Sequence, residues 1–354
     1  MNKDPFEEYI QHKEPGKAEK GYAWQTAIGL QAVDGIKTSE YLKQTAIRNI
    51  EGEIDFDEAQ ALLDSYYQEN AVHVTDDRTE EADKVSARIA QILSEKAFTF
   101  SPNEYIGIHA RLFHGIYKLA GEIRDYNISK KEWVLDGKSV LYGNSFDLRA
   151  ALEYDFELEK KFSYKGLSQD EIITHLAEFI SNLWQIHAFC EGNTRTTAVF
   201  LIKYLRYLGY EATNDIFAEN AWYFRNALVR ANYNDLKSGV HETTEFLELF
   251  LRNLLLNEKN ELHNRSMHIS RTFREKQDIG GQKQDIEVVL SAHQQKQYEK
   301  LLAAFGKTTV FGRSDMVAVL GITPSPASAL IKKLLEAGKI EAVAGHGKGK
   351  YIVK

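Results

Sequence analysis

The chain has 354 residues, of which 43% are hydrophobic and 27% charged, values that exclude wholesale disorder and predict two or three domains. The single cysteine, Cys190, excludes an internal disulfide and favours a reducing cytoplasmic location, and no apolar run reaches the roughly 20 residues of a membrane helix. The net charge of −7 is uneven, because residues 291–354 carry 10 Lys+Arg against 4 Asp+Glu (+6) and the remainder carries 34 against 47 (−13).

Residues 24–67 place apolar side chains at helical spacing, with interruptions at Asp34-Gly35 and Glu51-Gly52. A glycine that follows a periodic stretch is typical of a helix end, and Ser39 is suited to cap the next helix. The segment is therefore predicted to form three short helices.

Residues 83–256 are predicted to form a helical block, because successive stretches place apolar residues at i, i+3, i+4 and i+7. The exception is residues 131–143, where β-favouring residues flank Asp136-Gly137, a β-hairpin signal. On pattern alone a plain loop is an equal alternative.

Residues 257–285 are charged and end in Gly280-Gly281, which indicates a linker. In residues 286–354 the pattern predicts helices followed by two short strands around a glycine-rich turn, the order of a winged helix-turn-helix. The predicted fold class is mainly α, with an N-terminal helical segment (1–68), a central helical domain (69–265), a linker (266–285) and a winged-helix domain (286–354).

The stretch that carries chemistry is residues 186–199, IHAFCEGNTRTTAV. An amphipathic helix runs into His187, and a second apolar helix starts near Arg195. The polar turn Glu191-Gly192-Asn193-Thr194 lies between them at a helix N-terminus, where free N–H groups suit a phosphate. His187 is placed to take a proton from a hydroxyl, and Glu191 can hold a divalent cation. A loop between core helices is the structural alternative.

These residues resemble the motif of the Fic (filamentation induced by cAMP) family, H-P-F-x-[DE]-G-N-G-R-x-x-R, here running from His187 to Ala198. The upstream stretch HARLFHGIYKLAGEIR, residues 109–124, resembles the helix that precedes that family's flap, and residues 131–143 fall where the flap falls. The resemblance covers roughly residues 85–255.

The resemblance implies a Fic-type helical bundle with a β-hairpin flap that transfers AMP from ATP to a Ser, Thr or Tyr hydroxyl of a protein target. By carry-over His187 is the general base, Glu191 positions Mg²⁺, and Arg195 neutralises phosphate charge. The backbone of Gly192, Asn193 and Thr194 forms the anion hole. The flap residues expected to pair with the target as an added strand are Ser139, Val140, Leu141 and Tyr142.

Two positions depart from the family motif: Thr194 replaces its second glycine, and Ala198 replaces its second arginine. In the family that arginine meets the ATP γ-phosphate or an inhibitory glutamate, so both nucleotide choice and inhibition stay open, with CDP-choline-like or UTP donors as alternatives. The related death-on-curing toxins also depart here and transfer phosphate, but Glu191-Gly192-Asn193 favours nucleotidyl transfer.

Many members of the family are restrained by a helix that carries [ST]-x-x-x-E-[GN]. Two places in the N-terminal segment qualify in part: Asp34 with Leu30 at the Ser/Thr position, and Glu51 with Ile47 there. Residues 33–59 resemble the small antitoxin of this family, so residues 1–68 are expected to be a fused, antitoxin-like inhibitory segment. In that resemblance Asp34 takes the inhibitory position and is favoured, and deletion of residues 1–60 is expected to raise activity. The alternative is that these helices merely cover the core.

The winged-helix interpretation predicts DNA contacts from the helix with Ser328, Lys332 and Lys333 and from the hairpin with Lys348 and Lys350. Two functions remain open. The first is an autoinhibited protein adenylyltransferase that uses ATP and Mg²⁺ on a hydroxyl-bearing protein target. The alternative is a DNA-binding transcriptional regulator whose Fic core senses nucleotide and is catalytically weak. Homodimer formation is also left open, and no membrane partner is expected.

Overall fold

The computed structural model describes all residues except 1–4, 13, 15, 70–77, 213–215, 271–291, 307–308, 323–326, 328–329, 332–333, 336–338, 344–349 and 354. The chain divides into two compact units, Met1–Gln277 and Asp278–Lys354. The division lies within the linker predicted at residues 266–285. Among the described residues, no helix is long and apolar enough to cross a membrane.

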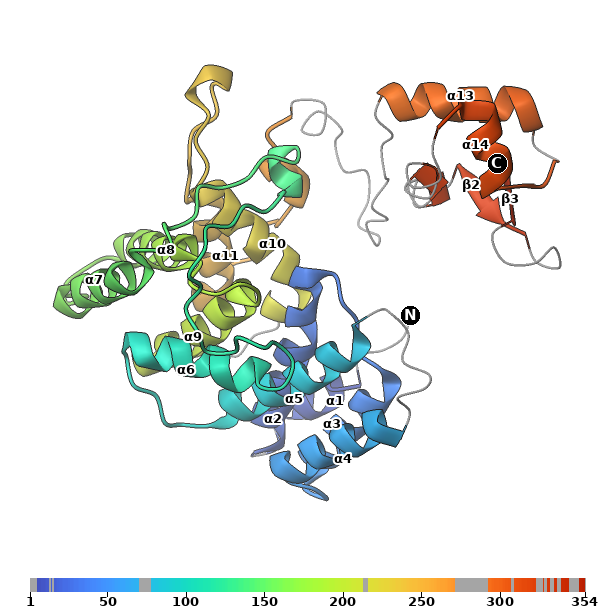
Figure 1. Cartoon of the computed structure of the whole chain (residues 1–354). Helices are drawn as coiled ribbons and strands as arrows, with labels where there is room; N and C mark the ends of the chain where they lie inside the picture. Colours follow the sequence, from blue (N-terminus) through green and yellow to red (C-terminus); the bar gives the residue numbers. More distant parts are fainter. Residues whose placement is uncertain are drawn as a thin grey trace. The chain divides into compact units, whose positions relative to one another are not determined.

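The first unit is helical, as the hydrophobic spacing predicts, and Figure 1 shows its elements in chain order. Its α-helices are α1 (Glu7–His12), α2 (Lys17–Gly29), α3 (Glu40–Glu51), α4 (Phe56–Glu69), α5 (Thr79–Ser94), α6 (Pro102–Phe113), α7 (Leu148–Lys161), α8 (Gln169–Ile186), α9 (Asn193–Tyr207), α10 (Ile216–Ala231) and α11 (Glu245–Leu256). Its 3₁₀ helices are η1 (Leu30–Asp34), η3 (Trp133–Leu135), η4 (Leu236–Ser238) and η5 (Asn264–Met267).

The N-terminal helices end where the glycines predict. Gly35 follows η1 at φ 67°, and Gly52 follows α3 at φ 81°, a left-handed conformation that glycine adopts without strain. The Ser39 hydroxyl caps α3 by accepting a hydrogen bond from the Leu42 amide. The three helices expected from residues 24–67 are therefore confirmed, with η1 as a continuation of α2.

The N-terminal segment belongs to the main core of the first unit. Trp24 and Leu30 are fully buried, and α2 packs against both α5 and α10. At Gly29 the approach to α10 is so close that a Cβ atom would lie 2.3 Å from the Cα of Ala218. Because this crossing leaves no room for a side chain, α2 and η1 are held firmly beside α10.

A buried carboxylate ties the next two helices to α5. Asp83 is fully buried and accepts hydrogen bonds from the Ser39 amide (2.8 Å), the Ser39 hydroxyl (2.5 Å) and the Tyr67 hydroxyl (2.7 Å). We expect Asp83→Ala to lower the free energy of unfolding by about 2–4 kcal/mol, because one buried donor and two part-buried donors lose their acceptor. Urea unfolding of the full chain measures this. Asp64→Ala, which removes the surface pair with Lys84, is the control, and a loss below about 1 kcal/mol for both variants contradicts the expectation.

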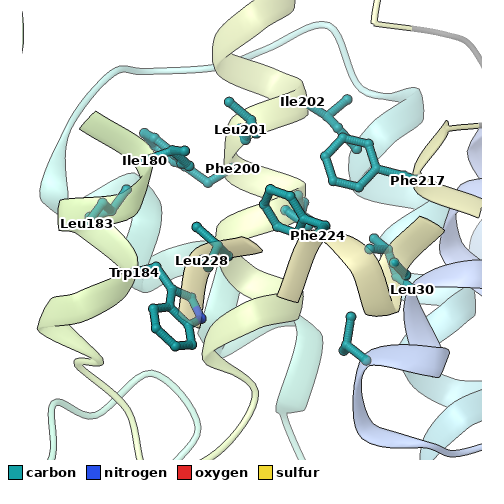
Figure 2. Packing of buried hydrophobic residues seen from close by; sticks show 14 of the residues in the cluster. Leu30, Ile180, Leu183, Trp184, Phe200, Leu201, Ile202, Phe217, Phe224 and Leu228 are labelled. Carbon is teal, nitrogen blue, oxygen red and sulfur yellow. The ribbon is translucent and has the colours of Figure 1, made fainter. Parts of the chain in front are cut away.

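Helices α8, α9 and α10 form the centre of this core. Figure 2 shows Trp184 of α8, Phe200 of α9 and Phe224 of α10 meeting in one cluster with Leu30 of η1. Every residue of α9 from Asn193 to Leu205 is buried, which an ordinary surface helix with one apolar stripe would not show. The helix that follows the polar turn is thus fixed on all sides.

The β-hairpin expected at residues 131–143 is not formed, and no strand lies in this described segment. Asp136 and Gly137 do take the positive φ angles of a hairpin turn, 54° and 80°. The chain before them coils into η3 instead, because the side chains of Val134 and Leu135 are buried in the core. A backbone hydrogen bond from Glu132 to Lys138 (2.9 Å) closes this turn.

The second unit has its own apolar core, formed by side chains such as Leu301, Phe311, Met316 and Val353. The described elements of this unit are α13 (Ala292–Phe305), β1 (Phe311–Gly312), α14 (Arg313–Leu320), β2 (Ile340–Ala342) and β3 (Lys350–Val353). The three described strands pair antiparallel in the order β1-β3-β2.

Candidate active site

The polar turn predicted between two core helices lies between α8 and α9. His187 ends α8 in a left-handed conformation (φ 50°, ψ 56°), which is strained for a residue with a side chain. Gly192 precedes α9 at φ 73°, and a Cβ atom there would lie 2.3 Å from the Phe113 ring. The turn therefore needs glycine at 192 for both backbone conformation and space.

Asn193 and His109 hold the turn from two sides. The Asn193 side chain accepts from the Phe189 amide (3.0 Å) and donates to its carbonyl (2.7 Å). The His109 ring stacks on the Phe189 ring with centroids 3.7 Å apart. Its Nδ1 accepts from the Gly121 amide (2.8 Å), so its Nε2 carries the proton and donates to the Glu191 carbonyl (3.1 Å). The backbone of the turn is thus preorganised.

The neutral state of His109 predicts a pH dependence of stability. Burial lowers the pKa of His109 to about 4, below the ordinary value of 6.5. On acidification the unfolded chain takes up a proton near pH 6.5, whereas the folded chain does so only near pH 4, so stability is greatest above pH 7 and falls as the pH decreases. We expect His109 to contribute a loss of about 2 kcal/mol between pH 7 and pH 5.

Urea unfolding at a series of pH values, without divalent metal, measures this contribution. The variant His109→Gln, which retains a polar side chain and does not titrate, should show a pH slope reduced by that amount. An unchanged slope in this variant would mean that the pKa of His109 is the same in the folded and the unfolded chain.

His187, the expected general base, is 3% exposed, and within the described part of the chain neither of its ring nitrogens has a hydrogen-bond partner. Burial lowers the pKa of His187 well below its ordinary value, and the positive charges of Lys130 and Arg225 act in the same direction. The Tyr142 ring covers the imidazole, with ring centroids 4.1 Å apart. The imidazole is therefore neutral and able to accept a proton, but it is closed off from a macromolecular substrate.

Arg195 lies in the first turn of α9 and is fully buried. Its guanidinium contacts the carboxylates of Glu81 (2.7 Å) and Asp34 (2.8 Å), the Gln31 amide oxygen (2.9 Å) and the Tyr117 hydroxyl (2.9 Å). Burial acts against the charged form, but the Asp34, Tyr117 and Glu81 interactions outweigh it and raise the pKa of Arg195. The arginine that the resemblance assigns to phosphate is thus already neutralised by two carboxylates.

The two candidate inhibitory residues lie in different places. Asp34 ends η1, and its carboxylate pairs with Arg195. Glu51 ends α3, and its carboxylate pairs with Lys17 at 2.8 Å on the surface. Leu30, at the position where the family motif has Ser or Thr, is fully buried in the core. Of the two carboxylates, the structure brings only that of Asp34 to the motif arginine.

Glu191, the expected metal ligand, keeps 56% of its side chain exposed and pairs with Lys130 at 3.1 Å. Among the described residues, no cluster of three or more His, Cys, Asp or Glu side chains is arranged to hold a metal ion. A single exposed carboxylate still fits Mg²⁺, which is commonly bound by one or two carboxylates together with substrate phosphates. Glu191 is the residue that would hold it, after exchanging Lys130.

The predicted flap residues 139–142 include Tyr142, whose ring lies against His187. Val140 and Tyr142 are buried, whereas Leu141 is 85% exposed. The Leu141 carbonyl accepts a hydrogen bond from the Gln185 side chain of α8 (3.1 Å), and the Ser139 hydroxyl accepts from the Lys130 amide (3.2 Å). This alternation of buried and exposed residues leaves the Leu141 side chain in solvent.

The two positions that depart from the family motif, Thr194 and Ala198, are buried in the core. The Thr194 hydroxyl accepts from the Trp184 indole (3.0 Å), and Ala198 is fully buried where the family has an arginine. Sequence reasoning missed Glu81, Glu132 and Arg225, which complete the charged cluster around Asp34. Each is far from the motif in sequence, so no spacing pattern could have found them.

Residues 99–205 match the model of the Fic/DOC family, so the chain carries a Fic/DOC domain at these positions. The chain is 19% identical to the N-terminal FIC domain of Bep8, a VirB-translocated effector protein from Bartonella sp. 1-1C, over 52% of this chain and 88% of that one (TM-score 0.39). It is 13% identical to a Fic family protein from Desulfovibrio desulfuricans G20, over 99% of this chain and 93% of that one (TM-score 0.46). No curated protein matches the chain.

Proposed function

We propose that this chain is a protein adenylyltransferase that transfers AMP from ATP to a hydroxyl of a protein target and is restrained by Asp34. The observation that carries the proposal lies in the α8–α9 turn of the Fic/DOC domain. It joins a buried, neutral His187 to a helix N-terminus whose first turn contains Arg195. A proton acceptor beside an anion-binding helix end suits transfer of a phosphoryl-linked group to a hydroxyl.

In this mechanism the target hydroxyl oxygen attacks the α-phosphorus of ATP. A new O–P bond forms, the bond to the β-phosphate oxygen breaks, and pyrophosphate leaves. His187 takes the hydroxyl proton, and displacement of the Tyr142 ring would return solvent to the imidazole and raise its pKa toward its ordinary value. Asn193 keeps the backbone amides at the start of α9 aimed at the phosphates. Mg²⁺ bound through Glu191 would supply further neutralisation of phosphate charge.

The test incubates the purified full chain and its Asp34→Ala variant with Mg²⁺ and ATP labelled at the α-phosphate, beside His187→Ala. Label on protein that requires His187 supports nucleotidyl transfer. Absence of label with retained nucleotide binding would favour a catalytically weak, nucleotide-sensing core. A parallel incubation uses ATP labelled at the γ-phosphate, and label on protein in that incubation alone would indicate phosphate transfer.

For the second unit we propose a winged helix that contacts DNA. The order of α13, β1, α14, β2 and β3 and the antiparallel sheet support this, as does the basic charge of residues 291–354. Lys350 lies at the start of β3, 3.9 Å from the Asp315 carboxylate. The other predicted DNA contacts, Ser328, Lys332, Lys333 and Lys348, lie outside the described residues.

A double Lys348→Ala/Lys350→Ala variant tests the DNA proposal. We expect it to weaken duplex DNA binding by the full chain about tenfold. The dependence of affinity on salt should also fall, because a protein with two fewer phosphate contacts releases fewer counterions. The proposal is contradicted if the parent chain shows no detectable DNA binding at 50 mM salt, or if the variant binds DNA with the same affinity as the parent chain.

A further inference from the structure

We propose that Arg225 of α10 forms an anion subsite together with Arg195, and that this subsite takes the terminal phosphates of a nucleoside triphosphate. In the described structure the Asp34 carboxylate occupies this subsite. The inference rests on the proposed function and deepens it, because it assigns nucleotide recognition to a residue outside the motif.

The two oxygens of Asp34 face two different guanidinium groups. One oxygen lies 2.8 Å from a terminal nitrogen of Arg195, and the other lies 3.6 Å from a terminal nitrogen of Arg225. A carboxylate that bridges two arginines occupies the kind of position that a phosphate oxygen pair would take. The first arginine comes from α9 and the second from α10, so the subsite exists only in the folded chain.

Two other carboxylates, those of Glu132 and Glu81, form ion pairs with these guanidinium groups. Glu132 is buried and pairs with Arg225 through both oxygens, at 2.8 and 2.9 Å. Glu81 pairs with Arg195 and also with Arg78, both at 2.7 Å. The side chains of Glu132 and Glu81 are 1% and 10% exposed, whereas that of Asp34 is 20% exposed. Asp34 is therefore the carboxylate of the three that an incoming anion can replace most readily.

The charges of this cluster support the same assignment. Asp34, Glu81 and Glu132 balance the three arginines Arg78, Arg195 and Arg225, so the cluster as described is neutral. Displacement of Asp34 leaves one net positive charge in a largely buried place, where charge interactions are strong. An anion with several negative oxygens is the ligand that such a place binds.

The subsite also lies beside the reacting residues. Glu132, which holds Arg225, accepts a hydrogen bond from the Tyr142 hydroxyl (3.1 Å), and the Tyr142 ring covers His187. Ala198, which stands where the family motif has its second arginine, is fully buried and carries no charge. Arg225 thus supplies, from another helix, a positive charge next to the catalytic turn.

The test measures binding of ATP, ADP and AMP to the full chain carrying Asp34→Ala, by titration calorimetry with Mg²⁺ present. Glu132→Gln is included in the background so that removal of Arg225 leaves no unpaired buried carboxylate. In that background we compare Arg225→Met, Arg225→Lys and Arg230→Met. The last removes a buried guanidinium five residues further along α10 and is the control.

We expect Arg225→Met to weaken ATP binding about 10- to 100-fold while AMP affinity changes less than about 3-fold, and Arg225→Lys to restore part of the loss. Equal weakening of ATP and AMP would mean that Arg225 only supports the fold and would overturn the inference. Unchanged ATP affinity, with ATP binding still lost in Arg195→Met, would overturn it as well and leave the proposed function standing. Absence of nucleotide binding in the Asp34→Ala background would remove the proposed function and the inference together.

Discussion

Replacement of Asp34 by alanine is expected to raise the rate of AMP transfer at least tenfold. In the described structure Asp34 and Glu81 both neutralise Arg195, and Asp34 also lies between that residue and Arg225. Its removal opens the position proposed for the terminal phosphates and restores positive charge there. A charge-assisted contact contributes about 1.5–3 kcal/mol, which corresponds to roughly a 10- to 100-fold change in an equilibrium.

The measurement is the initial rate of label incorporation from ATP labelled at the α-phosphate, with ATP affinity determined in parallel. Glu51→Ala is the matched control, because it removes the other candidate carboxylate, which pairs with Lys17 on the surface. We expect that control to behave like the parent chain. An equal rise in both variants, or no rise in Asp34→Ala, would show that Asp34 does not restrain the site.

A point substitution is the appropriate test of restraint. Deletion of residues 1–60, although the sequence predicts that it raises activity, is not a suitable test. The segment contributes Trp24, Leu42 and Ile50 to the main core, and α2 covers α5. Its deletion would expose that apolar face to water and would change stability together with activity. An effect of the deletion could therefore not be assigned to Asp34.

Replacement of His187 by alanine is expected to lower AMP transfer by about 10²- to 10⁴-fold, the usual contribution of a general base. The effect on stability should be small for a buried side chain. Among the described residues neither buried ring nitrogen has a partner, so the native histidine carries an unfavourable desolvation cost that alanine lacks. The substitution removes this cost and so gains some stability, but it also removes the contact with the Tyr142 ring, which offsets part of the gain.

The assay compares label incorporation and the unfolding midpoint of the variant with those of the parent. Nucleotide binding, measured on the same protein, should remain, because Arg195 and the amides of the α9 N-terminus are unchanged. Transfer that persists at the parental rate would exclude His187 as the base. Loss of transfer together with loss of nucleotide binding would point to a collapsed turn.

Much of the candidate site could be predicted from local sequence. The turn from His187 to Arg195 is set by a helix stop, a glycine and a helix start, and these are short-range signals. The structure adds the reasons: Gly192 has no room for a Cβ atom against Phe113, and Asn193 binds the backbone of Phe189. The preference for Asp34 over Glu51 came from the resemblance of residues 33–59 to the family's small antitoxin, because each of the two carboxylates precedes a glycine that ends a helix and local pattern does not separate them.

The segment at residues 131–143 shows where local signals mislead. The turn residues Asp136 and Gly137 take the conformations that a hairpin requires. Whether strands form on either side depends on where Val134 and Leu135 can be buried, and the core takes both through a 3₁₀ turn. Tertiary packing overrides strand propensity here.

The sequence by itself determined the mainly helical fold and the order of groups in the α8–α9 turn, because helix periods, caps and glycines act over a few residues. Tertiary structure alone decided the electrostatic surroundings of that turn. Glu81 lies 114 residues before Arg195, and Glu132 lies 93 residues before Arg225. Coulomb interactions depend on distance in space and on burial, and neither can be read from positions so far apart along the chain.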